Sequence, residues 1–159
     1  MNTVYLLLGS NMGESEQLLI VATNMIEKYI GKLVKSSSIY RTAAWGKEDQ
    51  PDFLNQIIIV SSSLSSSTVL KEMFGIEKEM GRVRTTKNAA RVIDIDMLFF
   101  NDEIIQTETL IVPHSQIQNR RFVLVPLAEI SPDFEHPILK KSSLELLSVC
   151  SDKLNVQKN

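Results

Sequence analysis

A chain of 159 residues that is 43% hydrophobic and 23% charged is predicted to fold as one domain over residues 1–159 without disulfides. Its net charge of −2 argues against a general nucleic-acid binder, which needs a basic face for backbone phosphates. The chain has one cysteine, its N-terminus carries no basic segment, and no apolar run approaches the ~18 residues of a membrane span. These features predict a cytoplasmic protein with no membrane anchor, which we take to be a monomer.

The first part of the chain predicts a strand, a helix and two further strands. Residues 4–8 form an apolar run that enters a turn at 9–13, and apolar residues recur at helical spacing over 18–29. Residues 33–41 and 53–62 are typical of strands, the second buried on both faces. The 9–13 loop lacks the Lys-Ser/Thr of a P-loop, so we interpret it as a turn in preference to a phosphate-binding loop.

A second helix is predicted over 69–80, after serines that suit its N-cap. Residues 82–91 show no apolar periodicity and predict a mobile segment that leads into a strand over 91–100. A small hairpin is expected where Asn101-Asp102 turns the chain and 103–105 pair back, followed by an amphipathic helix over 116–130. This order predicts an α+β fold, a ferredoxin-like split βαβ (βαββαβ) three-layer core with an appended hairpin and C-terminal helices.

The strand over 91–100 carries two carboxylates, Asp94 and Asp96, in an apolar run. Side chains alternate along a strand, so Ile93 and Ile95 point one way and both aspartates the other. Two carboxylates roughly 6–7 Å apart repel each other unless a cation lies between them. The structural alternative is a half-exposed strand with an acidic outer face, and the functional one is a divalent-metal site.

Five of the six arginines lie in a forty-residue window around the acidic strand, whereas the lysines are spread along the chain. The planar guanidinium suits bidentate contact with phosphate, although a basic surface patch would have the same composition. Beside a metal-type acid pair, the arginines indicate a polyphosphate site. They are Arg82, Arg84, Arg91, Arg120 and Arg121.

Three further residues have both a structural and a functional interpretation. Trp45, the only tryptophan, either covers the core from outside or forms a wall for a flat ligand. A lone histidine is more often structural than catalytic, but His114 follows a proline and lies near two arginines, so it is the better functional candidate. His136 is interpreted as a surface residue.

Three groups of motifs occur together in this order. They are Tyr40-Arg41-Thr42 with Gln50-Pro51-Asp52-Phe53-Leu54-Asn55, then Gly81-Arg82-Val83-Arg84 with Arg91-Val92-Ile93-Asp94-Ile95-Asp96, then Val112-Pro113-His114 with Asn119-Arg120-Arg121-Phe122. No one motif is specific, but with Gly9-Ser10-Asn11 their order and spacing resemble the 6-hydroxymethyl-7,8-dihydropterin pyrophosphokinase family over residues 1 to about 130. The resemblance implies transfer of the diphosphate of ATP to the hydroxymethyl oxygen of the dihydropterin, with release of AMP, in folate synthesis.

The resemblance also implies roles for individual residues. Two Mg²⁺ ions would be held on the ATP phosphates by Asp94 and Asp96, which would be catalytic together with Arg82 and Arg91. ATP would be bound by Arg84, His114, Arg120, Met97 and Ile111. The pterin would be bound by Thr42, Trp45, Phe53, Asn55 and Phe122, with the two phenylalanines stacked on its ring. Residues 84–91 would close over ATP and bring Arg91 onto the phosphates.

This chain departs from the family pattern at Asn88-Ala89-Ala90, where many members carry Trp-Gly-Pro, and at Ser115, where Tyr or Pro is expected. One alternative is therefore a family member that binds pterin or nucleotide but has lost activity. Another is a ferredoxin-like RNA-binding module, although the aromatic signature of such modules is absent and acids occupy a central strand.

Overall fold

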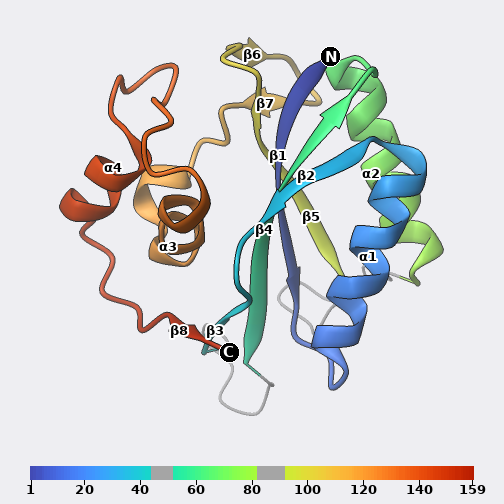
Figure 1. Ribbon diagram of the computed structural model, residues 1–159, viewed down its shortest axis with the longest axis horizontal. Helices are drawn as coiled ribbons and strands as arrows, with labels where there is room; N and C mark the ends of the chain where they lie inside the picture. Colours follow the sequence, from blue (N-terminus) through green and yellow to red (C-terminus); the bar gives the residue numbers. More distant parts are fainter. Residues whose placement is uncertain (44–51, 82–91) are drawn as a thin grey trace.

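The computed structural model describes residues 1–43, 52–81 and 92–159 and shows an α+β fold in which a β-sheet lies between two layers of helices (Figure 1). Helices α1 and α2 cover one face of the sheet, and α3 and α4 cover the other. The helices are α1 (Ser15–Tyr29), α2 (Ser66–Glu79), α3 (Arg121–Ile130) and α4 (Ser143–Val149). No helix in these ranges has the length and apolar character needed to cross a membrane.

The main sheet has the order β5-β1-β4-β3-β8, with β2 paired to β4 as well. Every pairing among its described strands is antiparallel. These strands are β1 (Asn2–Ser10), β2 (Lys32–Ser36), β3 (Tyr40–Thr42), β4 (Phe53–Ser62), β5 (Asp94–Phe100) and β8 (Gln157–Lys158). The acidic strand β5 therefore lies beside β1, and β1 lies beside β4.

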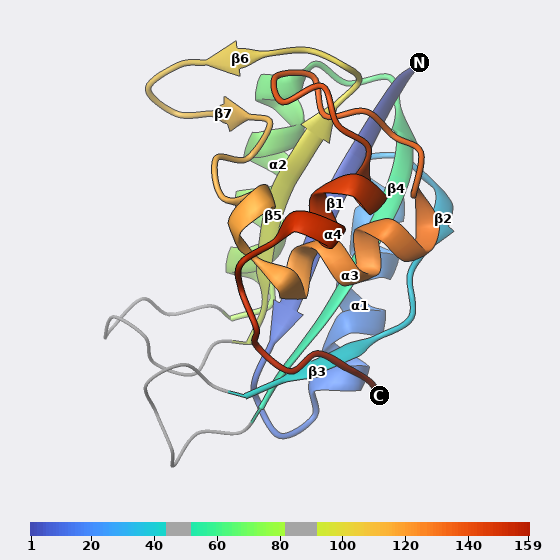
Figure 2. The ribbon, with the colours of Figure 1, turned by 90° about the vertical axis from the view of Figure 1, so that its left-hand side faces the viewer.

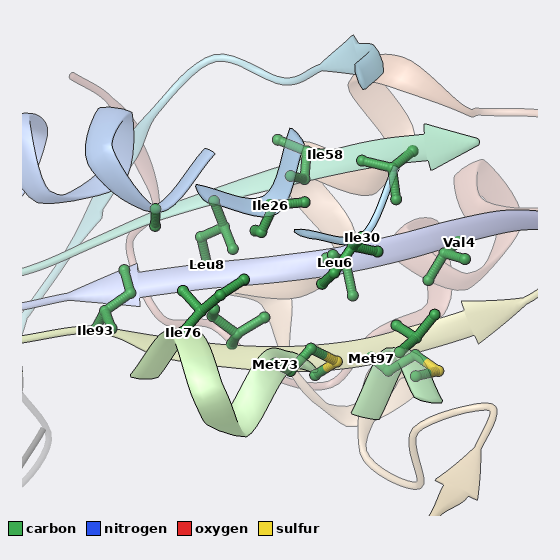
Figure 3. Close-up of a cluster of buried hydrophobic side chains, with 14 of the residues drawn as sticks. Val4, Leu6, Leu8, Ile26, Ile30, Ile58, Met73, Ile76, Ile93 and Met97 are labelled. Atoms are coloured by element: carbon green, nitrogen blue, oxygen red, sulfur yellow. The ribbon is translucent and has the colours of Figure 1, made fainter. Parts of the chain in front are cut away.

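The core has one hydrophobic cluster on each face of the sheet because the apolar strands β1 and β4 are buried on both sides. Leu6 and Leu8 of β1 pack against α1 and α2, where Figure 3 shows them with Ile76. Tyr5 and Leu7 point to the opposite face and pack with residues of α3 and α4. This two-sided burial is what a continuous apolar run predicts.

The ends of α2 agree with the local sequence. The Ser65 hydroxyl accepts a hydrogen bond from the Thr68 backbone N–H at 3.3 Å and so caps the helix. Gly81 follows the helix with a φ of 88°, a conformation that glycine adopts without a steric penalty. After α1, Gly31 is required for a different reason, because a Cβ there would overlap the Ser61 carbonyl.

The predicted strand over 33–41 is wrong as one element, since the structure has two strands with a break between β2 and β3. At the break, Ser37 bonds to β4 through its side chain: its hydroxyl accepts from the Ile57 N–H at 2.9 Å, while its own N–H donates to the Ile57 carbonyl. The Ser37 hydroxyl oxygen therefore accepts the hydrogen bond that a backbone carbonyl would accept in a regular strand pair. The sheet pairing therefore stops and resumes at Tyr40.

The hairpin predicted at 103–105 was assigned to the wrong partner strand. Strand β6 (Ile105–Gln106) pairs with β7 (Ile111–Val112) and not with the acidic strand β5. Asn101 explains this, because its N–H donates to the Thr3 carbonyl and its side chain accepts from the Thr3 N–H at 2.8 Å, which ties the turn to β1. The chain then leaves the sheet.

The predicted helix over 116–130 begins later, at Arg121. A single 3-10 turn (Ile117–Asn119) precedes it, and Arg120 between them is extended, with φ −126° and ψ 106°. The amphipathic pattern was thus correct over the second part of the segment only. This break places Arg120 and Phe122 at the start of α3.

His136 is buried, with 4% of its surface exposed, so its interpretation as a surface residue is wrong. Its Nδ1 accepts hydrogen bonds from the N–H groups of Ile138 and Leu139, each at 3.1 Å. These two donors require an unprotonated Nδ1, and the ring lies edge-on to Phe99 at 5.7 Å. Burial lowers the pKa of His136 below its ordinary value of 6.5.

The free energy of unfolding is expected to fall as the pH drops below about 6.5, because the unfolded chain takes up the His136 proton more readily than the folded one. His136→Asn keeps an acceptor oxygen near the Nδ1 position but does not titrate. Urea unfolding at pH 5, 6 and 7 should show a weaker pH dependence in this variant. His114 is present in both proteins, so its contribution cancels, and identical slopes would contradict the assignment.

Candidate active site

A cavity of about 1030 Å³ lies where the end of β1 meets the beginnings of β4 and β5, and residues from distant parts of the sequence line it. Its floor is formed by Leu7 and Gly9 of β1 and by the beginnings of β4 and β5. Residues of the 3-10 turn η1 (Ile117–Asn119), of the start of α3 and of the C-terminal tail (residues 151–159) form another part of the wall. The predicted site residues that line this cavity are Phe53, Asn55, Asp94, Asp96, Arg120 and Phe122.

The two aspartates of β5 lie on one face of the strand, as the alternation predicts. Both are half-buried and line the cavity. Ile95 and Met97 are each 4% exposed and belong to the core on the other face, although Ile95 also borders the cavity. Asp94 lies opposite Gly9 and Asp96 opposite Leu7 in the β1–β5 pairing. The acid pair therefore faces the cavity from β5, which is an edge strand of the main sheet paired with β1, and not from the central strand expected from the sequence.

This donor set fits a hard divalent cation. Carboxylates are the protein ligands that Mg²⁺ prefers, and it commonly takes one or two of them together with water and substrate phosphates. In the described part of the chain no group of three His, Cys, Asp or Glu side chains could hold a metal by itself. Water and substrate phosphates are the further ligands that Mg²⁺ commonly takes beside such a pair.

Asn55 lies on the floor of the cavity with 5% of its surface exposed. It pairs with Gly9 across the β1–β4 ladder and with Tyr40 across the β3–β4 ladder. A Cβ on Gly9 would lie 2.9 Å from the Asn55 side-chain oxygen, so the glycine makes room for the amide. The sequence around Gly9 predicted a turn, and its actual contribution is this space beside Asn55.

Two aromatic rings line the same cavity as the Asn55 amide. Phe53 begins β4, and Phe122 lies in the first turn of α3 with the Arg120 guanidinium 5.8 Å from its ring centre. Thr42 pairs with Phe53 and is buried, while the next residue, Ala43, lines the cavity. The structure thus brings the predicted ring-stacking residues and the amide to one cavity.

A second cavity of about 340 Å³ adjoins the first at Asp96 and contains other predicted residues. It is lined by Met97, Ile111 and His114, and Ile111 is 53% exposed. Burial lowers the pKa of His114, with the Asp96 carboxylate opposing the shift and Arg120 adding to it. The imidazole is therefore electrostatically linked to residues of both cavities.

Sequence reasoning missed Glu77 and Phe74 of α2. Glu77 is 4% exposed, lines the larger cavity and accepts a hydrogen bond from the Ile95 N–H at 2.9 Å. Phe74 lines both cavities and is 51% exposed. Two signals in the sequence could have indicated these residues. Glu77 is an acid directly after the apolar Ile76, and Phe74 is a large aromatic residue outside the apolar stripe of the helix.

The C-terminal tail was also missed. Residues 151–154 line the larger cavity, although 152–159 carry no apolar periodicity and little that indicates a site. The other predicted residues, Trp45, Arg82, Arg84 and Arg91, lie outside the described residues, as does the expected lid over 84–91.

Comparison with known proteins identifies the family. Residues 5–132 match the family model of 7,8-dihydro-6-hydroxymethylpterin-pyrophosphokinase (HPPK). The chain is 40% identical over 141 residues to the 2-amino-4-hydroxy-6-hydroxymethyldihydropteridine pyrophosphokinase of Aquifex aeolicus, covering 89% of this chain and 88% of that protein. It is 43% identical over 135 residues to the Bacillus subtilis protein of the same name, covering 84% and 81% of the two chains.

The fold also resembles solved structures. Wild-type Plasmodium falciparum HPPK-DHPS matches 93% of this chain with a TM-score of 0.73, and its form with pteroate matches 92% with a TM-score of 0.75. This chain spans 43% and 42% of those longer chains, and the identity of 19% in each case supports the fold alone. On its sequence match and its relatives, the chain belongs to the 7,8-dihydro-6-hydroxymethylpterin-pyrophosphokinase family.

Proposed function

We infer that this chain, a pyrophosphokinase of folate biosynthesis, carries out its reaction in the larger cavity. The pterin hydroxymethyl oxygen attacks the β-phosphorus of ATP, the bond from that phosphorus to the oxygen shared with the α-phosphate breaks, and AMP leaves. The hydroxyl proton is released. The observation that carries this proposal is that one cavity holds an acid pair, a buried amide and two phenylalanines.

The pterin would lie between Phe53 and Phe122, because a flat heterocycle gains most from contact with the faces of aromatic rings. Asn55 would pair with the polar edge of the ring, since its amide offers both donors and an acceptor. Backbone groups near Thr42 would contribute further, and Trp45 is assigned to the pterin from the sequence pattern. This arrangement would place the hydroxymethyl group toward β5.

ATP would extend from the smaller cavity into the larger one. Met97 and Ile111 would contact the nucleoside, while His114 and Arg120 would contact phosphates near Asp96. Arg82, Arg84 and Arg91 are assigned to the phosphates from the sequence pattern. Positioning of the reactants and stabilisation of charge account for most of the catalysis in phosphoryl-type transfer, so no covalent intermediate is needed.

Asp94 and Asp96 would hold Mg²⁺, which when bound neutralises charge on the phosphate oxygens. With the ion bound, the two carboxylates would set the position of the phosphates relative to the sheet, because pairing with β1 holds the backbone of β5. The hydroxymethyl oxygen would then approach from the side of the cavity that Asn55 occupies. This division assigns β5 to ATP and β4 to the pterin.

The proposal extends to the topology of the core, the domain organisation, the localisation and the oligomeric state. The strand order β5-β1-β4 with β2 and β3 on β4, and the helices α1 and α2 on one face, supports a ferredoxin-like split βαβ core. The length of the chain supports a single domain over residues 1–159, and its single cysteine fits the cytoplasm. A monomer is proposed as the oligomeric state. Light scattering of the purified chain tests the oligomeric state.

The function is tested by incubating the chain with ATP, Mg²⁺ and 6-hydroxymethyl-7,8-dihydropterin and separating the products. AMP and the pterin diphosphate are expected in equal amounts, with no AMP when the pterin or Mg²⁺ is omitted. Binding of pterin and ATP without AMP would favour the impaired family member. Binding of single-stranded RNA in place of pterin would favour the RNA-binding module.

A further inference from the structure

The C-terminal tail contributes to the larger cavity although it lies beyond the segment that matches the family. That match ends at residue 132, whereas the cavity is lined by Ser151, Asp152, Lys153 and Leu154. Figure 2 shows the tail leaving α4, passing α3 and ending beside β3. We propose that Asp152 is a positioning residue, which holds the start of α3 so that Phe122 and Arg120 face the cavity.

Helix α3 has no N-cap in its own sequence. Arg120 occupies the N-cap position, and its side chain makes no capping hydrogen bond. The first backbone N–H groups of a helix need acceptors, and Ser, Thr, Asp or Asn commonly supply one locally. Here the Asp152 carboxylate accepts a hydrogen bond from the Arg121 N–H at 2.9 Å, across 31 residues of sequence.

The second oxygen of the same carboxylate shapes the tail. It accepts from the Leu154 N–H at 2.9 Å, and the Arg121 guanidinium donates to the Leu154 carbonyl at 3.4 Å. The backbone N–H groups of Arg121 and Leu154 hold the pKa of Asp152 below its ordinary range. One ionised carboxylate thus joins the start of α3 to the turn of the tail that lines the cavity.

The far end of the tail is fixed as well. Strand β8 pairs with β3, and the Asn159 N–H donates to the Ile39 carbonyl at 2.8 Å. The Arg41 guanidinium donates to the Asn159 side-chain oxygen at 2.6 Å, and Lys158 lies 3.7 Å from the Glu129 carboxylate near the end of α3. Because both ends are held, the position of Asp152 is determined by the sheet and by α3.

Asp152 holds the backbone of Arg121, and the side chains that it would position belong to the residues on either side. Arg120 precedes Arg121 and Phe122 follows it, and the Arg120 guanidinium lies over the Phe122 ring. A shift of the Arg121 backbone therefore moves both. Phe53 and Asn55 stand on β4, so loss of Asp152 would disturb one side of the cavity and leave the other in place.

The test compares Asp152→Ala and Asp152→Asn with Glu145→Ala, all in the full chain. Glu145 is a matched control, because its carboxylate also accepts a backbone N–H at a helix start, that of Ser142, but α4 does not line the cavity. Asp152→Ala should weaken pterin binding by about tenfold or more, because the start of α3, which carries Phe122, loses a hydrogen bond to a charged group. ATP-analogue binding should weaken less, since among the residues assigned to ATP only Arg120 moves.

Asp152→Asn should be intermediate, because one amide oxygen can replace one of the two carboxylate acceptors. Glu145→Ala should lower the melting temperature and leave pterin affinity unchanged. Unchanged pterin affinity in Asp152→Ala, equal weakening of both ligands, or equal weakening by Glu145→Ala would overturn the proposal.

A measurement made without ligand tests the positioning role of Asp152 separately from the proposed function. The choice of pterin as the ligand rests on that proposed function. Amide hydrogen exchange at residues 121–124 should be faster in Asp152→Ala than in the wild type and unchanged in Glu145→Ala. Failure of the wild type to release AMP would contradict the function alone. Unchanged exchange in Asp152→Ala would overturn the positioning role whatever the reaction.

Discussion

Asp94→Ala and Asp96→Ala are each expected to lower kcat by about 10²–10³-fold, the loss typical of removing one charge-stabilising group from an active site. Both carboxylates line the larger cavity, and their backbone is fixed by the β1–β5 ladder. Ile95 and Met97 of the same strand belong to the core on the other face, and their side chains are kept in both variants. The free energy of unfolding is therefore expected to stay within about 1 kcal/mol of the wild type.

The measurement pairs AMP release with urea unfolding. Asp94→Asn and Asp96→Asn keep the shape of the side chain and remove its charge, so they should lose as much activity as the alanine variants if the charge is what matters. Asp102→Ala is the matched control, since Asp102 is an exposed acid in the turn that follows the same strand. Near-normal turnover in either alanine variant would show that the acid pair does not hold the metal.

Much of the site could be predicted because it depends on alternation along strands. A period of two places Asp94 and Asp96 on one face and Ile95 and Met97 on the other, and the structure confirms this placement. The same rule places Phe53 and Asn55 on one face of β4. Each of these predictions concerns residues within a single strand, whose geometry is local.

The errors arose where a tertiary contact replaced a local one. Ser37 ends a strand by offering its hydroxyl to β4, and Asn101 sends the chain away from the sheet by bonding to Thr3. His136 is buried by contact with Phe99 and two backbone donors. In each case the partner lies at a sequence distance, or in a conformation, that the local pattern does not encode.

The cavity residues that were missed have the same origin. Glu77 reaches the cavity from a helix on the opposite face of the sheet, where it accepts a hydrogen bond from the Ile95 backbone. Asp152 reaches it by pairing with a helix that begins 31 residues earlier. Side-chain periodicity predicts which face a residue occupies, but it does not predict which distant backbone group needs an acceptor.

Asn55→Ala is expected to weaken pterin binding by about ten- to a hundredfold, because an unpaired buried polar edge of the ligand costs about 1–3 kcal/mol. ATP-analogue affinity should change little, since the residues assigned to ATP lie on β5, on the segment that contains His114, and at Arg120. Calorimetry with each ligand separates the two effects. Gln56→Ala is the matched control, as Gln56 is the next residue on β4 and bonds to the Ser37 carbonyl at 2.9 Å.

Gly9→Ala tests the same contact from the neighbouring strand. The added methyl would lie 2.9 Å from the Asn55 side-chain oxygen, closer than a Cβ contact allows, so the amide must turn away from its present position. Pterin affinity should therefore fall in Gly9→Ala although Asn55 is still present, and the double variant Gly9→Ala/Asn55→Ala should be little worse than Asn55→Ala alone, because both changes remove one contact. Fully additive losses, or equal weakening of pterin and ATP in either single variant, would show that Asn55 does not read the edge of the pterin.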